Sequence, residues 1–422
     1  MIRRAALALA LVAAPAQAGG LYVEAGALLD VESGELREGQ CVLTDGERIA
    51  RVEPCGATPD GAERVDWSTF TVLPGLIDLH THLADAGQSA DLAAPIKTSP
   101  AATALIGAHN ARVTLAAGFT TVRDVGTYRG LTDVALRNAI EAGHVPGPRM
   151  FVAGGYLTHP GGGGELNGVV PNEDLPADMR LGVLSGEVQA AEKATRLLDG
   201  GVDFLKLMAT GAVLAIGTEP GQPELTEAEM RAAIAVAAQR GTYATAHAHG
   251  AAGIKAAIRT GARSIEHASL IDEEGLLMAR EAGVWLVMDV YNGDYIDQIG
   301  TAEGWPEEYL RKNRETTQEQ RNRFRRAVEL GVPLAFGSDA GVFPHGLNAR
   351  QFSYMVANGM TPLQAVRSAT VEAAKVLGKD GELGTLRAGA FADLIAVRGN
   401  PLDNVRVLES VEGVIKGGVE IP

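Results

Sequence analysis

Residues 74–82 read Pro74-Gly-Leu-Ile-Asp-Leu-His-Thr-His82, and the fold that we expect is built outward from them. A short apolar run after a Pro-Gly turn predicts a buried strand, because strands covered on both faces read as continuous apolar segments. His80 and His82 stand at the end of the run. Side chains two residues apart on a strand point to the same side, so the two imidazoles would form half of a metal site.

Seven further strand candidates follow, separated by helical patterns. They cover residues 120–125, 149–154, 203–208, 243–249, 264–267, 284–289 and 333–339. One helix is expected over residues 226–239, where Thr226 and Glu229 form a capping box, and another begins at Thr361, with proline in its first turn. Eight strand–helix units in this length predict an α/β protein with a (β/α)8 TIM barrel.

Both ends of the chain have a different pattern from the middle. Residues 21–73 and the segment after residue 391 read as short strands separated by Gly, Asp and Pro turns. We expect the two ends to meet in a small β-sandwich domain, with residues 19–73 as its first part and residues 386–422 as its second. The barrel would then occupy residues 74–385.

The composition excludes several classes of partner. The chain has 422 residues, of which 46% are hydrophobic and 21% charged, as is typical of a globular protein. Its 37 Lys and Arg residues stand against 52 Asp and Glu residues, and no stretch gathers the basic ones together. We therefore expect a small-molecule substrate, and neither nucleic acid nor an anionic membrane as a partner.

The first 18 residues predict a secretory signal peptide. Two arginines precede a short uncharged run, and Ala-Gln-Ala follows at residues 16–18. The alternative is an N-terminal membrane anchor, but the apolar run is short for a bilayer span. We expect cleavage after Ala18 and a periplasmic or secreted protein that has no membrane partner once the signal is removed.

The chain has two cysteines, Cys41 and Cys55. An oxidising compartment would permit a disulfide between them. However, a hairpin turn at Asp45-Gly46 would place Cys41 nearer Ala50 than Cys55, so the sequence leaves the pairing open. Two cysteines alone do not make a zinc site.

Two of the later strand candidates carry further groups that can bind metal. Lys206 lies inside the apolar run of residues 203–208. A buried lysine is costly unless it is paired or neutral, so Lys206 is either a residue whose amine reaches the surface or a deprotonated amine that CO2 can carboxylate. His247 and His249 end the next strand and share a face, so geometry does not say which of them binds metal.

His267 and Asp339 end two more of the strand candidates. The carboxyl ends of barrel strands are where ligands and catalytic groups gather, so these residues, together with the others at strand ends, predict a metal site. One such residue could be a satisfied polar group of the core, but packing does not account for the whole set. Imidazole and carboxylate ligands without thiolate favour zinc, although manganese or cobalt could replace it.

These segments resemble the amidohydrolase superfamily. The resemblance rests on the stretch quoted first, on Lys206 and on the motifs Ala246-His-Ala-His-Gly250, Ile265-Glu-His267 and Gly337-Ser-Asp-Ala-Gly341. Within it, the chain is more similar to the branch of imidazolonepropionase-like and Xaa-Pro-dipeptidase-like metal carboxypeptidases that includes ochratoxin-hydrolysing amidases. That closer likeness lies in residues 204–211, 289–296 and 337–346.

The resemblance implies two divalent metals, most simply zinc. His80 and His82 would hold the more buried metal, and His247 and His267 the more exposed one. A carbamate formed by CO2 on Lys206 would bridge the two. Oligomers are common among such barrels, so we also expect a homo-oligomer.

The resemblance also implies a reaction. A metal-bridging hydroxide would attack the amide carbonyl of a dipeptide or N-acyl amino acid, and the C-terminal amino acid would be released. Asp339 would ligate the first metal and shuttle the proton to the leaving nitrogen. The alternatives are hydrolysis of a cyclic amide, such as an imidazolone or lactam, and a non-catalytic binding protein, which would lack one of the ligands.

Three residues are candidates for substrate binding. Tyr243 lies four residues before His247 on the same strand face, and packing in the core is its alternative role. The resemblance implies that a tyrosine here and a histidine from the loop after the third strand hold a free α-carboxylate. That histidine would be His159, although many relatives have a different order of residues in this loop. His345 follows Asp339 and would line the pocket or orient a metal ligand.

Overall fold

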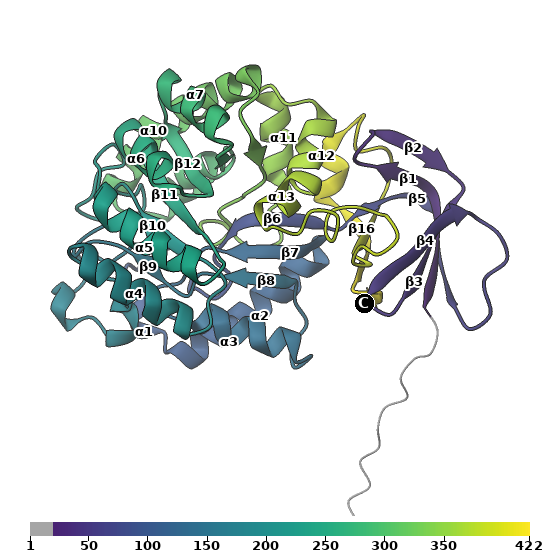
Figure 1. The fold of residues 1–422 in the computed structure, drawn as a ribbon, viewed down its shortest axis with the longest axis horizontal. Coiled ribbons are helices and arrows are strands. Elements are labelled where there is room, and N and C mark those ends of the chain that lie inside the picture. Colours follow the sequence, from purple (N-terminus) through teal and green to yellow (C-terminus); the bar gives the residue numbers. More distant parts are fainter. Residues whose placement is uncertain (1–19) are drawn as a thin grey trace, which may run out of the picture.

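The computed structural model describes residues 20–422, so the predicted signal peptide lies outside the described residues. Figure 1 shows a body of helices around interior strands, with a β-rich lobe at one side. None of the helices between residues 20 and 422 has the length and apolar character that a membrane span requires.

Parallel strands form the interior of the body in two sheets, with the orders β6-β7-β8 and β14-β13-β12-β11-β10-β9. The strands are β6 (Leu76–Thr81), β7 (Phe119–Asp124), β8 (Arg149–Val152), β9 (Tyr156–Leu157), β10 (Leu205–Met208), β11 (Ala244–Gly250), β12 (Ser264–Leu270), β13 (Trp285–Val287) and β14 (Leu334–Ala335). β6, β7, β10 and β11 are buried along their whole length, as expected for strands covered on both faces.

Backbone hydrogen bonds cross both junctions between the two sheets. Beyond β14, the N–H of Asp339 donates to the carbonyl of His80 at 2.9 Å. At the other junction, β8 and β9 follow one another along the chain, and the N–H of Asp203 donates to the carbonyl of Val152 at 2.8 Å. The predicted α/β class is confirmed, and the structure shows two parallel sheets where the sequence predicted one closed barrel.

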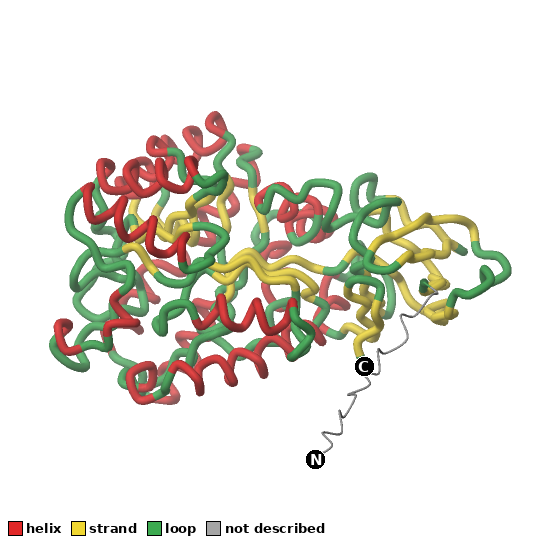
Figure 2. The backbone as a smooth tube through the Cα atoms, turned by 60° about the horizontal axis from the view of Figure 1, so that its bottom comes forward, coloured by secondary structure: helices red, strands yellow, loops and turns green. Residues whose placement is uncertain are grey.

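Helices cover the outside of these sheets (Figure 2). They are α1 (Ala94–Lys97), α2 (Pro100–Ala116), α3 (Thr132–Glu141), α4 (Glu187–Asp199), α5 (Glu227–Gln239), α6 (Ala251–Thr260), α7 (Glu273–Ala282), α8 (Asn292–Tyr295), α9 (Thr301–Glu303), α10 (Glu307–Leu330), α11 (Arg350–Ala357), α12 (Pro362–Ser368) and α13 (Val371–Val376). The predicted capping box of Thr226 and Glu229 opens α5, and Thr361 caps α12. Sequence patterns therefore located both helix starts correctly.

The two ends of the chain form a separate, mixed sheet. Its order is β17-β16-β15-β5-β1-β3-β4, with β2 paired to β1. The strands are β1 (Leu21–Asp30), β2 (Glu35–Glu38), β3 (Gln40–Asp45), β4 (Arg48–Pro54), β5 (Glu63–Pro74), β15 (Leu394–Val397), β16 (Val411–Lys416) and β17 (Val419–Ile421). Val23, Trp67 and Ile415 belong to its apolar core, which joins residues from both ends. Where the sequence predicted a β-sandwich, the described residues show one hydrogen-bonded sheet.

The hairpin of β3 and β4 decides the pairing of the cysteines. Cys41 lies opposite Glu53, two residues before Cys55, and the two cysteines form a disulfide with their Cα atoms 4.9 Å apart. The expectation that Cys41 would lie nearer Ala50 than Cys55 is wrong. The turn falls at Gly46 and Glu47, which moves the pairing by two residues, and a bulge beside Ala50 moves it by one more.

Candidate metal centre

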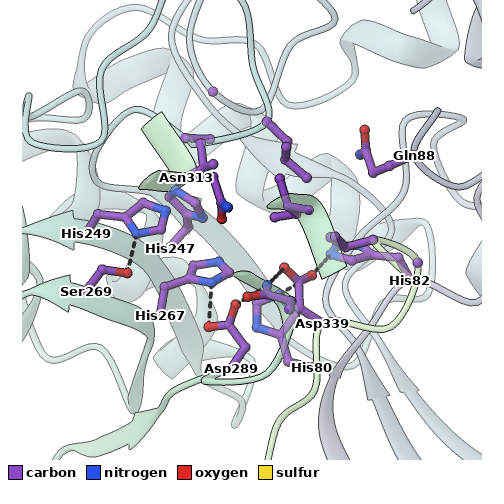
Figure 3. Close-up of a pocket in the computed structure, with 18 of the residues that line it drawn as sticks. His80, His82, Gln88, His247, His249, His267, Ser269, Asp289, Asn313 and Asp339 are labelled. Atoms are coloured by element: carbon purple, nitrogen blue, oxygen red, sulfur yellow. Dashed lines mark hydrogen bonds and ion pairs between the residues drawn. The ribbon is translucent and has the colours of Figure 1, made fainter. Parts of the chain in front are cut away.

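The predicted ligands meet in one cavity beyond the carboxyl ends of the parallel strands (Figure 3). Parallel strands end at the same edge, so residues far apart in sequence come together there. The cavity is lined by all six predicted ligands, His80, His82, Lys206, His247, His267 and Asp339, and also by His249 and Asp289.

One group of ligand atoms comes from His80, His82 and Asp339. The Nε2 atom of each histidine lies 3.4 Å from Oδ1 of Asp339. Nδ1 of His80 donates to Oε2 of Glu266 at 2.9 Å, and Nδ1 of His82 donates to the carbonyl of Gly126 at 2.7 Å. Because both acceptors lack a proton, Nδ1 carries the hydrogen in each ring and Nε2 keeps its lone pair for a metal.

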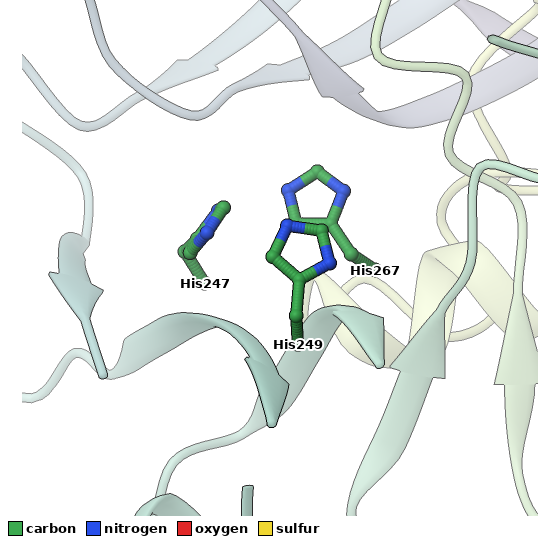
Figure 4. A group of neighbouring side chains, drawn as sticks. All are labelled: His247, His249 and His267. Carbon is green, nitrogen blue, oxygen red and sulfur yellow. The ribbon is translucent and has the colours of Figure 1, made fainter. Parts of the chain in front are cut away.

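A second group consists of His247, His249 and His267 (Figure 4). Nε2 of His247 lies 3.1 Å from the carbonyl of Gly211, so Nδ1 is the free atom of that ring. In His267 the bonded atom is Nδ1, which lies 2.9 Å from Oδ1 of Asp289, so Nε2 is the free atom of that ring. His249 belongs to the same group, so the structure, like the sequence, leaves two imidazoles of β11 available at this position.

Asp289 connects the two groups, and the sequence assigned it no role. Its carboxylate groups with His267 and Asp339, and the ligand atoms of the three lie within 4.8 Å of one another. The amide of Asn292 donates to Asp289 and also to Oδ2 of Asp339, the latter at 3.1 Å. A signal was present, since Asp289 ends a predicted strand in the same way as Asp339 does.

The amine of Lys206 is buried without a hydrogen-bond partner. The residue is 2% exposed, and its Nζ is among the buried atoms that lack a partner within the described part of the chain. Burial lowers the pKa of Lys206 to about 8. An unpartnered buried amine is costly, so its position inside the cavity indicates that it is completed by a group that binds there.

The charges of the site fit a bound cation. Burial lowers the pKa of His80 to about 4, and burial and the neighbouring imidazoles hold the pKa values of His247 and His249 well below the ordinary value. Burial alone would raise the pKa of Asp339, but the imidazoles beside it hold it below its usual range. Neutral imidazoles beside an ionised carboxylate are the form in which these residues bind divalent metals.

His82 and His267 have raised pKa values instead. Burial opposes protonation in both, but the hydrogen bond to Asp339 raises the pKa of His82 to about 9, and the charge of Asp289 raises that of His267. A cation at either Nε2 would displace a proton. Metal binding is therefore expected to release protons.

Two of the predicted ligands have left-handed backbone conformations. His267 has φ of 69° and Asp339 has φ of 62°, values that residues other than glycine rarely adopt. Such strain persists only where the surrounding structure enforces it, and it clusters at functional sites.

Comparisons with known proteins agree on one family. The sequence model of the Amidohydrolase family matches residues 71–421. The chain belongs to the amidohydrolase family. An ochratoxinase of Aspergillus niger is 30% identical over 428 aligned residues, which cover 96% of this chain and 88% of the ochratoxinase.

Solved structures of the same fold include two peptidases. A Xaa-Pro dipeptidase with bound methionine in its active site has 35% identity and a TM-score of 0.89, over 96% of this chain and 100% of that one. A prolidase complexed with N-methylphosphonate-L-proline has 30% identity and a TM-score of 0.87, over 95% and 99%. This amidohydrolase is therefore a hydrolytic enzyme that acts on amide bonds.

The predicted substrate role of Tyr243 is not supported by its position in the amidohydrolase. Its ring stacks on Phe204, with centroids 5.3 Å apart, and Cζ of Arg263 lies over the ring, 3.9 Å from its centroid. It is not among the residues that line the cavity. Tyr243 does share a strand face with His247, but four residues of strand span about 13 Å, which places it at the opposite end.

The other two predicted substrate residues also lie outside the cavity lining. Nε2 of His159 lies 3.0 Å from the carboxylate of Glu229, at the start of α5. His345 is packed in the loop after Asp339, with both ring nitrogens buried and without a partner among the described residues. Burial lowers the pKa of His345 to about 3. Neither histidine is placed to touch a substrate in the cavity.

The walls of the cavity come from residues that the sequence did not single out. Eight of them are apolar or aromatic: Tyr128, Tyr156, Met208, Ala212, Val213, Leu214, Ile296 and Val342. Gln88, Asn313 and Thr317 add polar groups. Tyr156 and Met208 lie in β9 and β10, and most of the others lie in loops after the strands or on α10, where no periodic pattern marks them.

A loop of four glycines, residues 161–164, borders the cavity through Gly163. The N–H of Gly163 donates to both carboxylate oxygens of Glu224, at 2.8 and 3.0 Å. Burial raises the pKa of Glu224 to about 7, although the hydrogen bond from Gly163 opposes this. The carboxylate that holds this loop therefore titrates near neutral pH.

Replacing Glu224 by Gln is expected to change how stability depends on pH. The pKa of Glu224 is about 7 in the folded protein against an ordinary 4.5, so the folded state binds this proton more tightly and stability falls as pH rises between these values. Glutamine keeps an acceptor for Gly163 but cannot ionise. We expect Glu224→Gln to be more stable than the wild type at about pH 8, by on the order of 2 kcal/mol, with little difference at about pH 4. Denaturant unfolding over this range measures the effect, and parallel stability curves would contradict it.

Proposed function

We propose that this amidohydrolase uses two divalent metals to hydrolyse the amide bond of dipeptides or N-acyl amino acids and to release the C-terminal amino acid. The observation that carries the proposal is the position of Asp339. Its carboxylate groups with His80 and His82 on one side and, on the other, with His267, whose Nδ1 is held by Asp289. One carboxylate between two adjacent sets of ligands fits two cations held side by side.

We assign a carbamate on Lys206 as the bridge between the two metals. Only a neutral amine reacts with CO2, and a pKa lowered to about 8 increases the neutral fraction of Lys206 near neutral pH. The anionic carbamate would reduce the repulsion between the cations. We propose zinc, because imidazole and carboxylate ligands without thiolate suit it.

The metals, when bound, polarise the substrate carbonyl and lower the pKa of a water molecule. The chain contributes the base. The carboxylate of Asp339 accepts the proton of that water and passes it to the leaving nitrogen. Asn292 holds Oδ2 of Asp339 at 3.1 Å, while Oδ1 faces His80 and His82. This fixed orientation keeps the base directed at the reacting groups.

The substrate class is supported by the names of the relatives and by the cavity walls. The relatives are a Xaa-Pro dipeptidase, a prolidase and an ochratoxinase. The apolar wall that includes Met208, Leu214 and Ile296 suits an uncharged side chain. Because the predicted carboxylate-binding residues lie outside the cavity lining, the hydroxyl of Tyr128 and the amide of Gln88 are the donors we propose for the substrate carboxylate.

We also propose that the two parallel sheets are arcs of one (β/α)8 barrel over residues 74–385, with residues 19–73 and 386–422 as an accessory β domain. We propose export, followed by assembly into a homo-oligomer. The disulfide supports an oxidising compartment. N-terminal sequencing of protein recovered from the periplasm or medium should begin at Gly19, and light scattering should give more than one chain mass.

Cleavage of free-acid substrates, but not of amidated ones, is the expected result of a substrate panel. Dipeptides and N-acyl amino acids are compared with the same compounds amidated at the C-terminus. We expect amidation to lower kcat/KM at least about 100-fold, because the groups that bind the carboxylate are then left unpaired. Chelation should abolish cleavage, and two equivalents of zinc should restore it. Equal rates for both forms would count against the proposed substrate class, and turnover only of imidazolones or lactams would favour the cyclic-amide alternative.

A further inference from the structure

We infer that Glu266 is a positioning residue that selects the metal-binding tautomer of His80, and that Arg123 holds Glu266 in place for this purpose. The inference rests on the two-metal site proposed above. It assigns the more buried metal a supporting carboxylate of its own, distinct from the one that supports the other metal.

The two carboxylate oxygens of Glu266 have different partners. Glu266 is fully buried in β12, and Oε1 accepts from Nη2 of Arg123 and from Oγ of Ser264, both at 2.8 Å, and also from the hydroxyl of Thr245. Within residues 20–422, Oε2 has one side-chain partner, Nδ1 of His80 at 2.9 Å. Oε1 is therefore surrounded by donors, and Oε2 is left for the imidazole.

Arg123 is rigidly held, and this fixes the carboxylate in turn. The guanidinium is fully buried, its Nε donates to the carbonyl of Leu79 at 2.7 Å, and its Nη1 donates to Oγ of Ser264 at 3.0 Å. Leu79 is the neighbour of His80 in β6, so one arginine joins the ligand strand to the strand of Glu266. A fork-shaped donor held at three points leaves the carboxylate little freedom to rotate.

The position of Glu266 determines which ring nitrogen of His80 has a lone pair for the metal. A neutral imidazole has one N–H and one lone pair, and an ionised carboxylate accepts only a proton donor. Glu266 therefore requires the hydrogen on Nδ1, and Nε2 is left free at 3.4 Å from Asp339. The opposite tautomer would present N–H to the metal, and no coordinate bond could form.

The other metal has a separate carboxylate of the same kind. Oδ1 of Asp289 accepts from Nδ1 of His267 at 2.9 Å and from Nε2 of Gln320 at 3.1 Å. The two supporting carboxylates contact different histidines, Glu266 on His80 and Asp289 on His267. Removing one of them should therefore weaken one metal site and spare the other.

The test is metal binding by Glu266→Gln, measured by cobalt titration of the apo-protein against a chromophoric chelator. Three donors surround Oε1, so the glutamine oxygen takes that place and its NH2 faces His80. His80 must then accept at Nδ1, which puts its hydrogen on Nε2. We expect one of the two metals to bind about 10–100-fold more weakly and the other to bind with wild-type affinity.

Double variants identify which site is weakened. The double variant Glu266→Gln with His80→Ala should still bind the second metal tightly, because both changes act on the same metal. Adding His267→Ala to Glu266→Gln instead should remove the remaining tight site. Glu229→Gln is the matched control, because Glu229 is also a buried glutamate bonded to a histidine, 3.0 Å from His159 and outside the metal centre. It should bind both metals as the wild type does.

If Glu266→Gln alone fails to fold, a second variant without an unpaired buried charge tests the same inference. Arg123→Met combined with Glu266→Gln removes both members of the buried pair, so neither charge is left alone. This variant should melt cooperatively and still show one weakened site. Two wild-type affinities in either folded variant would overturn the inference, and so would equal weakening of both sites. A wild-type protein that binds fewer than two metals would instead contradict the proposed function.

Discussion

Asp339→Asn is expected to lower kcat by about 1,000-fold or more while leaving the metals bound. General acid–base catalysis contributes about 10²–10⁴-fold, and the amide of asparagine cannot take up the proton of the attacking water. Asparagine keeps an oxygen that can face His80 and His82. The residue also tolerates the left-handed backbone at this position, where φ is 62°. The variant should therefore fold and load metal but turn over very slowly.

Steady-state kinetics and metal analysis of the same preparation measure this result. Asp199→Asn is a suitable control, because the exposed carboxylate of Asp199 pairs with Arg240 and has no part in the cavity. It should have wild-type kinetics. Near-normal kcat in metal-loaded Asp339→Asn would show that another group moves the proton. Loss of both metals would show that Asp339 acts chiefly as a ligand.

Lys206→Met is expected to lose tight metal binding and, with it, at least about 1,000-fold in kcat/KM. Metal ions supply several kcal/mol of transition-state stabilisation, and each 1.4 kcal/mol corresponds to about tenfold in rate. Methionine matches the length of the lysine stem but cannot carry a carbamate. Because the amine of Lys206 is buried without a partner, the apo form of the variant should be no less stable than the wild-type apo-protein.

Lys312→Met is the matched control for this substitution. Lys312 is also fully buried, but its Nζ donates to the carbonyls of Ala215 and Thr218 and to Glu308. Its replacement leaves these acceptors unpaired and should cost about 1–3 kcal/mol of stability, with both metals still bound. The two buried lysines should thus show opposite effects.

The carbamate itself can be observed. Wild-type apo-protein should reload metal fully in buffer that contains bicarbonate and poorly in buffer freed of CO2. With ¹³C-bicarbonate, it should show a carbamate resonance that Lys206→Met lacks. Two metals bound at wild-type affinity by Lys206→Met would rule out this role for Lys206.

Much of the site was predictable because a strand has a short, regular repeat. His80 and His82 lie two residues apart, and Lys206, His267 and Asp339 each stand in or after an apolar run. Such runs form parallel strands, and metal-binding and catalytic side chains lie at the carboxyl ends of these strands. All of these residues line the cavity.

The substrate residues could not be predicted in the same way. Tyr243 lies on the same strand face as His247 but at the end of the strand away from the cavity, where its ring stacks on Phe204. The ring of His159 is bonded to Glu229. Which residue of a loop reaches a cavity depends on the path of the loop. That path is set by distant contacts, such as those of Glu224 with Gly163 and of Lys312 with Ala215. No local pattern records them.

The amino-acid sequence alone places the chemical groups at the ends of the strands and predicts a metal centre there. Local preferences suffice for that, because the apolar pattern and the alternation of side chains are properties of each strand's own sequence. The tautomers and the burial of these groups depend on the tertiary structure. The tautomer of His80 depends on Glu266, that of His267 depends on Asp289, and the unpartnered amine of Lys206 depends on its burial among all of them. These are contacts between strands, and they exist only when the strands have come together.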